Sequence, residues 1–154
     1  MVWNSYGLDR IAQELVHNAK DRDLEAKKQN PKEPGSLNQA HKMRMTIAYG
    51  LERFWGEHLR LKGKKASDEN KSRFWKETWD AFCTIMEDTK TGINLPKDLV
   101  RSDDMNKIRA ISKQLWELPV EKQRVAIAVL TQLCDCIVWW TQRYKGKSSD
   151  ETNS

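Results

Sequence analysis

The side chains able to do chemistry in this sequence are few, and their spacing favours structural roles. Cys134 and Cys136 lie two residues apart in a helical pattern, which points them to roughly opposite faces and keeps them from bridging or chelating together. His58 lies on an apolar stripe with no second histidine or cysteine at the spacing of a zinc site, so we expect a structural histidine. Asp103 and Asp104 stand at a helix start, where carboxylates cap free backbone N–H groups.

The larger motifs of catalysis and cofactor binding do not occur in the sequence. It contains no glycine-rich phosphate loop, no pair of histidines at helical metal-binding spacing and no serine nucleophile elbow. Cys83 falls among apolar residues, as small buried thiols do. The sequence therefore predicts a protein that is not an enzyme and that holds neither a metal nor another cofactor.

Basic residues carry the stronger functional signal. The chain has 27 Lys and Arg against 22 Asp and Glu, a net charge of +5. Residues 58–76 hold seven basic and two acidic residues, and residues 105–147 hold eight basic and three acidic residues. Positive charge concentrated in this way suits a polyanionic partner.

One face of the second predicted helix extends this positive charge. At about 100° per residue, Lys42, Tyr49, Arg53 and Arg60 align opposite the core stripe of that helix. Lysine and arginine contacts to phosphates give affinity without sequence preference, so we predict single-stranded DNA or RNA as a partner. The alternative for such a stripe is a solvated helix face whose charges pair with acids at i,i+4. The candidate binding residues are Lys42, Tyr49, Arg53, Arg60, Lys62, Lys64, Lys65, Lys71, Arg73 and Lys76.

The elements that must position these residues are helices. Apolar residues recur every three or four positions in five segments, and glycine and proline fall between the segments. We expect helices from 7 to about 28, from 36 to about 63, from 67 to before 92, from 102 to 118 and from 119 to 144. The predicted fold class is all-α: a single-domain bundle of about five helices over residues 1–147, with the last long helix central and a disordered tail over 148–154.

The apolar stripes identify the expected core. The second helix should bury Ala40, Met43, Ile47, Leu51, Phe54 and His58, and the fourth should bury Met105, Ile108, Ser112 and Leu115. Most of the seven tryptophans also lie on or beside such stripes, so we expect them in the core and not as base-stacking platforms. These are Trp55, Trp75, Trp79, Trp116, Trp139 and Trp140.

The chain shows no sign of export or membrane insertion. Its first residues turn polar at Asn4 and Ser5 and then aromatic, unlike a signal peptide, so we expect a cytoplasmic protein. The apolar stretch Val125–Trp140 is interrupted by polar residues and is shorter than the roughly 18 residues of a membrane span. We therefore expect a buried helix there and no membrane partner.

Three segments resemble the small subunits of CRISPR–Cas effector complexes. They are Ile47–Trp55, Arg73–Trp79 and Cys136–Tyr144, and the likeness covers roughly Leu37 to Gly146. Those subunits are also all-helical, basic, of about this length and free of catalytic motifs. More narrowly, the chain resembles the helical domain that ends the large subunit of cyanobacterial type I-D, Cascade-like complexes, which is also made separately from an internal start.

The resemblance implies a role in antiviral defence as one part of a larger assembly. Several copies would pack head to tail beside the other subunits along a guide-RNA complex. Their basic faces would line a channel and stabilise the opened target strand of the R-loop, while the guide RNA reads the sequence.

Two other functions stay open. The chain could be a helical protein–protein adaptor whose basic patches only keep it soluble. It could also be a helix-turn-helix DNA-binding protein with its turn at Leu118–Val120, although the helix after that turn is the most apolar in the chain and a recognition helix needs a polar face. Salt-dependent binding would separate the first function from the adaptor, and sequence-specific protection would favour the third.

Overall fold

The described part of the chain is built from helices and loops. The computed structural model describes residues 5–89 and 91–145, and within these ranges no strand occurs, which confirms the predicted all-α class. The predicted tail over 148–154 lies outside the described residues. The elements are α1 (Ser5–Gln29), α2 (Gln39–Thr46), the 3₁₀ helix η1 (Ile47–Tyr49), α3 (Leu51–Arg60), α4 (Ala66–Asp88), α5 (Met105–Trp116) and α6 (Val120–Lys145).

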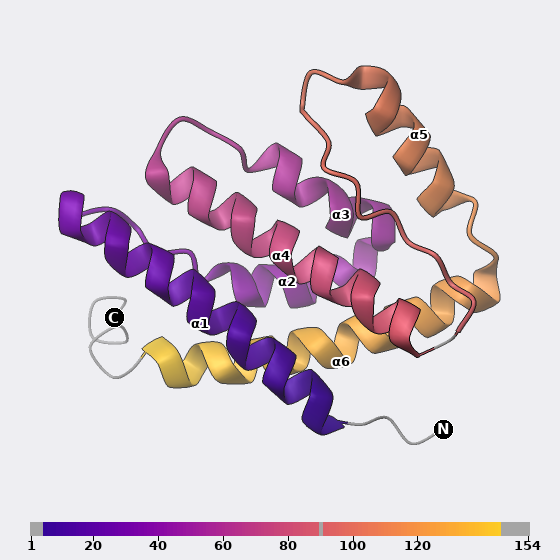
Figure 1. The fold of residues 1–154 in the computed structure, drawn as a ribbon, viewed down its shortest axis with the longest axis horizontal. Coiled ribbons are helices and arrows are strands. Elements are labelled where there is room, and N and C mark those ends of the chain that lie inside the picture. The colour runs from indigo at the N-terminus through magenta and orange to yellow at the C-terminus, as the bar shows by residue number, and fades with distance from the viewer. Residues whose placement is uncertain (1–4, 90, 146–154) are drawn as a thin grey trace.

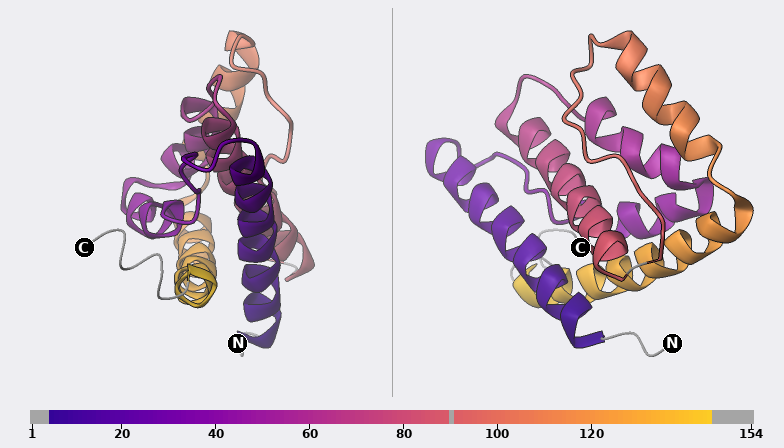
Figure 2. Two further views of the ribbon diagram at one scale, coloured as in Figure 1. Left: turned by 90° about the vertical axis from the view of Figure 1, so that its left-hand side faces the viewer. Right: turned by 45° about the vertical axis from the view of Figure 1, so that its right-hand side comes forward.

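The long helices α1, α4 and α6 form the framework of the bundle. α6 crosses α1 in the most extensive helix contact, and α4 packs against both α1 and α3 (Figure 1). The right-hand view in Figure 2 shows α6 across the lower part of the bundle, with α1 crossing it near its C-terminal end and α4 rising above it. The inward faces of α1, α2, η1, α3 and α4, including the whole stripe expected of the second predicted helix, meet inside this framework. The buried residues there are Leu8, Ala12, Leu15, Val16, Ala19, Ala40, Met43, Ile47, Leu51, Phe54, His58, Phe74, Trp75, Trp79, Phe82 and Met86.

The prediction of one continuous second helix is wrong. The chain leaves α2 through η1 and turns at Gly50, which has φ 97° and ψ 174°, before α3 begins. Essentially only glycine adopts this region of backbone space. The apolar spacing continues across the turn because η1 packs on α6 while α3 packs on α4, so both elements need an inward apolar face.

Buried polar groups fix the short helix α2 against its neighbours. The indole N–H of Trp75 donates to Gln39 Oε1 over 2.9 Å, and both side chains are buried. The backbone N–H and the hydroxyl of Ser36 donate to Asp23 Oδ2 over 2.8 and 3.1 Å. Burial raises the pKa of Asp23, and the two bonds from Ser36 offset part of that effect. The loop between α1 and α2 is therefore held near its end, three residues before α2 begins.

The start of α4 is held by a residue from that same loop. Glu33 Oε1 accepts the backbone N–H of Ser67 over 2.7 Å, which satisfies one of the free donors of the first turn. This bond lowers the pKa of Glu33. The connection between α3 and α4 is thereby placed beside the loop that follows α1.

An extended segment lies along α4 before α5 begins. The indole N–H of Trp79 donates to the Pro96 carbonyl over 2.7 Å, and Lys76 Nζ donates to the Lys97 carbonyl over 3.1 Å. The segment buries three apolar side chains, Ile93, Leu95 and Val100. The segment thus packs along α4, and its residue Leu99 lines a pocket there.

The helix α5 is the most peripheral element. It packs on α3, where the Ser112 hydroxyl donates to Glu52 Oε1 over 2.9 Å. Asp104 caps α5, as expected, by accepting the Lys107 backbone N–H over 3.1 Å. Ser112 and Leu115 are buried as predicted, but Met105 is 76% exposed. The prediction for Met105 was wrong because it lies on the first turn of a helix covered on one side only.

The helix α6 presents one face to α1, α2 and α4 and another to the surroundings. Leu130 and Leu133 are fully buried, whereas Val125 and Trp139 are exposed. By length and composition alone α6 is able to span a membrane, so the expectation that its apolar stretch is too short was wrong. Seven of its side chains are nonetheless buried against the bundle, as in a core helix.

Candidate nucleic-acid interface

The connection between α3 and α4 carries exposed lysines. Lys62, Lys64 and Lys65 follow the last turn of α3, and all three are exposed. Within the described ranges no acid lies within ion-pair distance of any of them. Lys71 and Arg73 continue the positive charge along the first turns of α4. We call these five residues the cationic strip.

The residues predicted upstream do not lie along a single helix face with the strip. Lys42 is on α2, Tyr49 on η1 and Arg53 on α3, and the turn at Gly50 separates the first two from the third. All three side chains are exposed. The Arg53 guanidinium lies over the Tyr49 ring, 5.4 Å from its centroid. The predicted single helix face from Lys42 to Arg60 is therefore wrong, although Arg53 and Arg60 still align, seven residues apart on α3, and the cation–π pair spans the turn.

Two of the predicted phosphate contacts are already engaged inside the molecule. Both oxygens of the Glu57 carboxylate accept N–H groups of Arg60 over 2.8 Å. Lys76 Nζ lies 2.6 Å from Asp80 Oδ1, and the Lys76 side chain is only 14% exposed. Arg60 and Lys76 therefore have less capacity to bind a phosphate than the lysines of the connection.

Arg73 makes only a long ion pair with Glu77, because Arg22 makes the shorter ion pair with the same carboxylate. Arg22, from α1, lies 2.8 Å from Glu77 Oε1, whereas Arg73 lies 3.9 Å from Glu77 Oε2. The Arg73 side chain is exposed. Arg73 thus keeps donors free at the edge of the strip.

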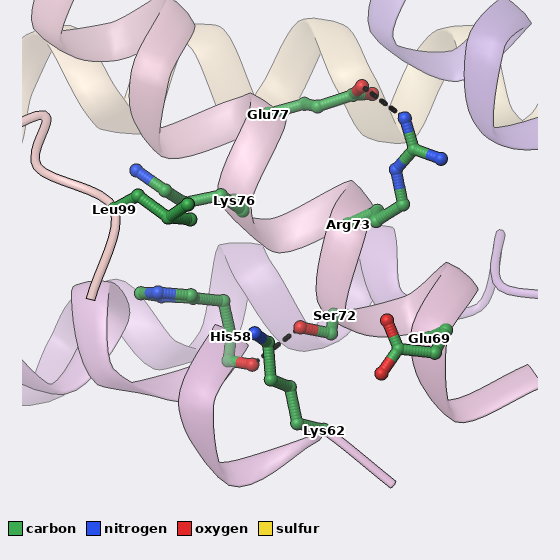
Figure 3. Close-up of a pocket in the computed structure, with 8 residues that line it drawn as sticks. All are labelled: His58, Lys62, Glu69, Ser72, Arg73, Lys76, Glu77 and Leu99. Carbon is green, nitrogen blue, oxygen red and sulfur yellow. Dashed lines mark hydrogen bonds and ion pairs between the residues drawn. The ribbon is translucent and has the colours of Figure 1, made fainter. Parts of the chain in front are cut away.

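A pocket of about 220 Å³ opens between α3, α4 and the segment that follows α4. Figure 3 shows its walls: Lys62 and His58 come from the α3 side, Lys76 and Arg73 from α4, and Leu99 closes one end. Three members of the predicted site therefore meet at one hollow. The sequence analysis did not predict that His58 lines the same pocket as Lys62, Arg73 and Lys76.

His58 is buried to 2% exposure, and burial lowers its pKa. The nearby cations Lys76 and Lys62 lower this pKa further, and Asp80 opposes them. One ring nitrogen, Nδ1, bonds the Trp55 carbonyl. The other, Nε2, is buried and has no hydrogen-bond partner among the residues that the structure describes. The expected structural histidine thus has one satisfied and one unsatisfied nitrogen.

The tryptophans divide into a buried and a partly exposed group. Trp55, Trp75 and Trp79 are buried, as predicted. Trp116 and Trp139 are 68% and 52% exposed, so their assignment to the core was wrong. They end outside because α5 and the last turns of α6 are each covered on one side only. The guanidinium of Arg143 lies over the rings of Trp139 and Trp140, at 4.9 and 5.1 Å.

The thiols are not activated. Burial raises the pKa of Cys83 to about 12 and that of Cys136 to about 11, and it raises the pKa of Cys134 as well. Thiols with raised pKa values are poor nucleophiles at neutral pH. In the described ranges, no three side chains of His, Cys, Asp or Glu are grouped so that they could hold a metal ion.

Comparison of the chain with models of protein families, with curated proteins and with solved structures finds no match.

Proposed function

We propose that this protein is a non-catalytic small subunit of a CRISPR RNA-guided complex, and that it binds single-stranded nucleic acid through the cationic strip. The binding would be independent of base sequence, because phosphate contacts fix position without reading bases. The place in such a complex rests on the resemblance of the three sequence segments. The nucleic-acid contact rests on the charges themselves.

The observation that carries the proposal is the cluster of Lys62, Lys64 and Lys65, three exposed lysines within four positions of the chain, of which only Lys65 has a charge interaction with Glu33. Some basic side chains in the described ranges, such as Arg22 and Arg60, have an acid at 2.8 Å, and others, such as Arg109 and Arg124, have no salt-bridge partner there. The three lysines have none, although acids are frequent in the chain. Three neighbouring cations repel one another, so their position is explained better by an external anion than by local stability.

Contacts with other subunits or with further copies are supported by exposed apolar side chains. Met105 and Trp116 lie eleven residues apart on α5, which places them on one side of that helix, and Val120 follows at the start of α6. All three are more than 60% exposed. Tryptophan is a frequent anchor of protein–protein contacts.

The same apolar side chains favour a second candidate, the protein–protein adaptor. An adaptor would use Trp116 and its neighbours as the binding surface and would need no nucleic acid. The two candidates differ in what the lysines do, and salt dependence separates them.

The test is a salt titration of binding to two labelled single-stranded oligonucleotides of different base composition. The expected result is equal affinity for both, with log affinity falling by about 0.7 per phosphate neutralised for each unit of log salt. Binding should be weak for the isolated chain and tighter in an assembly of copies. Absence of salt-dependent binding in both settings would favour the adaptor, and strong preference for one sequence would contradict the proposed mode of binding.

A further inference from the structure

We infer that a groove between α1 and the last turns of α6 binds a guanine nucleotide, with the base stacked on Trp139, its Watson–Crick edge against Asp9 and its phosphate at Arg143. The inference goes beyond the proposed function, because none of these residues belongs to the cationic strip and because the strip does not distinguish bases. The groove has a volume of about 440 Å³, within the range of about 300–1,000 Å³ typical of pockets for small molecules.

The walls of the groove come from two helices that cross. Trp139 and Arg143 lie four residues apart on α6 and share one face of it, and Cys136 and Trp140 form the neighbouring row. Asp9 faces these rows from α1, which packs across α6 (Figure 1). After burial, the charge of Asp9 is the largest cause that raises the pKa of Cys136 to about 11. The Asp9 carboxylate therefore lies beside that thiol, about one helix turn from the two indoles.

The aromatic wall is open to a ligand. The Trp139 side chain is 52% exposed, whereas Trp55 and Trp75 are buried in the core. The Trp140 ring stands edge-on to that of Trp139, with centroids 5.2 Å apart and planes at 81°, so the two indoles form a corner. Unpaired bases stack on exposed aromatic side chains, and such stacking holds any base. Trp139 can therefore supply stacking that the cationic strip does not.

A cation without an acidic partner lies beside these rings. The Arg143 guanidinium is 4.9 Å from the centroid of Trp139 and 5.1 Å from that of Trp140. Its side chain is exposed, and no acid of the described residues lies within ion-pair distance of it. A guanidinium binds phosphate through charge-assisted hydrogen bonds. The groove thus offers one aromatic surface and one phosphate-binding group side by side, as a nucleotide requires.

The carboxylate of Asp9 decides which base fits. The other acid of the groove, Asp135, is held by Arg44 over 2.7 Å, whereas Asp9 has no ion pair among the described residues. An ionised carboxylate only accepts hydrogen bonds. Guanine presents two adjacent donors, N1–H and the 2-amino group, on its Watson–Crick edge. Adenine and cytosine place a ring-nitrogen acceptor there, and uracil flanks its single N–H with two carbonyls, so a carboxylate repels part of each of those edges.

The experiment is an NMR titration of the full chain with the 5′-monophosphates of guanosine, inosine, adenosine and uridine. The guanosine nucleotide should bind about tenfold tighter than the adenosine and uridine nucleotides, and it should shift the indole N–H signal of Trp139. Inosine lacks the 2-amino group, so its nucleotide should have an intermediate affinity. Guanosine without its phosphate should bind more weakly than the nucleotide, and Arg143→Gln should remove that difference.

Two pairs of variants separate the roles of the acid and the ring, and all four side chains are exposed. Asp9→Asn should remove the preference for guanine, because the amide has one acceptor in place of two. Asp21→Asn, also on α1 but outside this groove, should keep the preference. Trp139→Ala should abolish binding of all four nucleotides, whereas Trp116→Ala, on α5, should not.

The inference and the proposed function fail on different results. Equal affinities for the four nucleotides, no binding of any of them, or a guanine preference that survives in Asp9→Asn would each overturn the inference and leave the proposed function intact. The cationic strip is measured separately with oligothymidylate and oligocytidylate, neither of which contains guanine. Absence of salt-dependent binding to those strands would overturn the proposed function and leave the guanine site intact.

Discussion

The ability of a basic side chain to bind a phosphate depends on what already holds it. Arg60 and Lys64 are only four residues apart in the sequence, but they differ in availability. Arg60 donates to both oxygens of Glu57, whereas Lys64 has no ion pair among the described residues. An exposed pair of this kind adds little to stability, but it must be broken before Arg60 meets a phosphate. The lysines of the α3–α4 connection carry no such cost.

His58 should make the stability of the fold depend on pH. Its folded pKa is lowered below the ordinary value of 6.5, chiefly by burial, so below about pH 6.5 the unfolded chain takes up a proton that the folded chain refuses. The free energy of unfolding should therefore fall as pH drops from 6.5 toward the folded pKa, by at most about 1.4 kcal/mol per pH unit. Urea unfolding of the wild type and of His58→Gln across this range measures it. Equal pH slopes in the two proteins would contradict the assignment.

At the residue scale, the sequence predicted which side chains are charged or reactive better than it predicted which of them are already paired inside the fold. The cations of the α3–α4 connection and the absence of an activated thiol both follow from residue type and local pattern. The engagement of Glu77 by Arg22 does not, because the two residues are 55 positions apart and meet only when α1 packs on α4. The sequence also could not predict that His58 Nε2 has no partner among the described residues, because its surroundings form only when the helices pack.

The turn at Gly50 decides the course of α2, η1 and α3. The apolar spacing predicted a single helix here, because Ile47 and Leu51 are both buried and lie four apart. The spacing of apolar residues alone cannot reveal that the helix direction changes, because η1 before the turn and α3 after it each pack an apolar face against a neighbouring helix. The glycine was the available signal, and its positive φ gives that signal a physical cause.

A pair of glycine substitutions tests this turn. Gly50→Ala should lower the free energy of unfolding by about 1–3 kcal/mol, because alanine must adopt a region of backbone space that is almost exclusive to glycine. Gly56→Ala, in the middle of α3, should be neutral or stabilising by up to about 1 kcal/mol, since the new Cβ meets only Glu52 Oε1 at 4.0 Å. Denaturant unfolding of both variants gives the comparison. Similar losses at the two sites would show that the backbone at Gly50 is not strained for other residues.

The burial of α6 gives a second test at the element scale. Leu130→Ala and Leu133→Ala should each cost about 2–5 kcal/mol, because both side chains are fully buried and truncation leaves a cavity. Gln132→Ala, between them but exposed, should change stability by less than about 0.5 kcal/mol. Losses below that value at both leucines, measured by urea unfolding, would mean that α6 packs through another face.

Across the whole molecule, the cationic strip and the most exposed apolar side chains of α5 and α6 lie on different elements, although α5 and α6 also carry basic residues. The cationic strip belongs to α4 and the connection before it, while Met105, Trp116 and Val120 belong to α5 and the start of α6. A subunit that binds a strand and also contacts neighbours needs two such surfaces, and an adaptor needs only the second. The sequence predicted the all-α bundle from periodicity, but it placed Trp116 and Trp139 in the core because spacing does not say how many sides of a helix are covered.

The most direct test of nucleic-acid binding by the strip is a comparison of two variants with equal loss of charge. One carries Lys64→Ala and Lys65→Ala in the strip, and the other carries Arg109→Ala and Arg124→Ala, which are exposed on α5 and α6. Both remove two positive charges, so any effect of net charge is the same in each. The slope of log affinity for single-stranded nucleic acid against log salt should flatten by about 1.4 in the first variant, at about 0.7 per lost phosphate contact, and stay at the wild-type value in the second. Equal slopes in the two variants would contradict the assignment of binding to the α3–α4 connection.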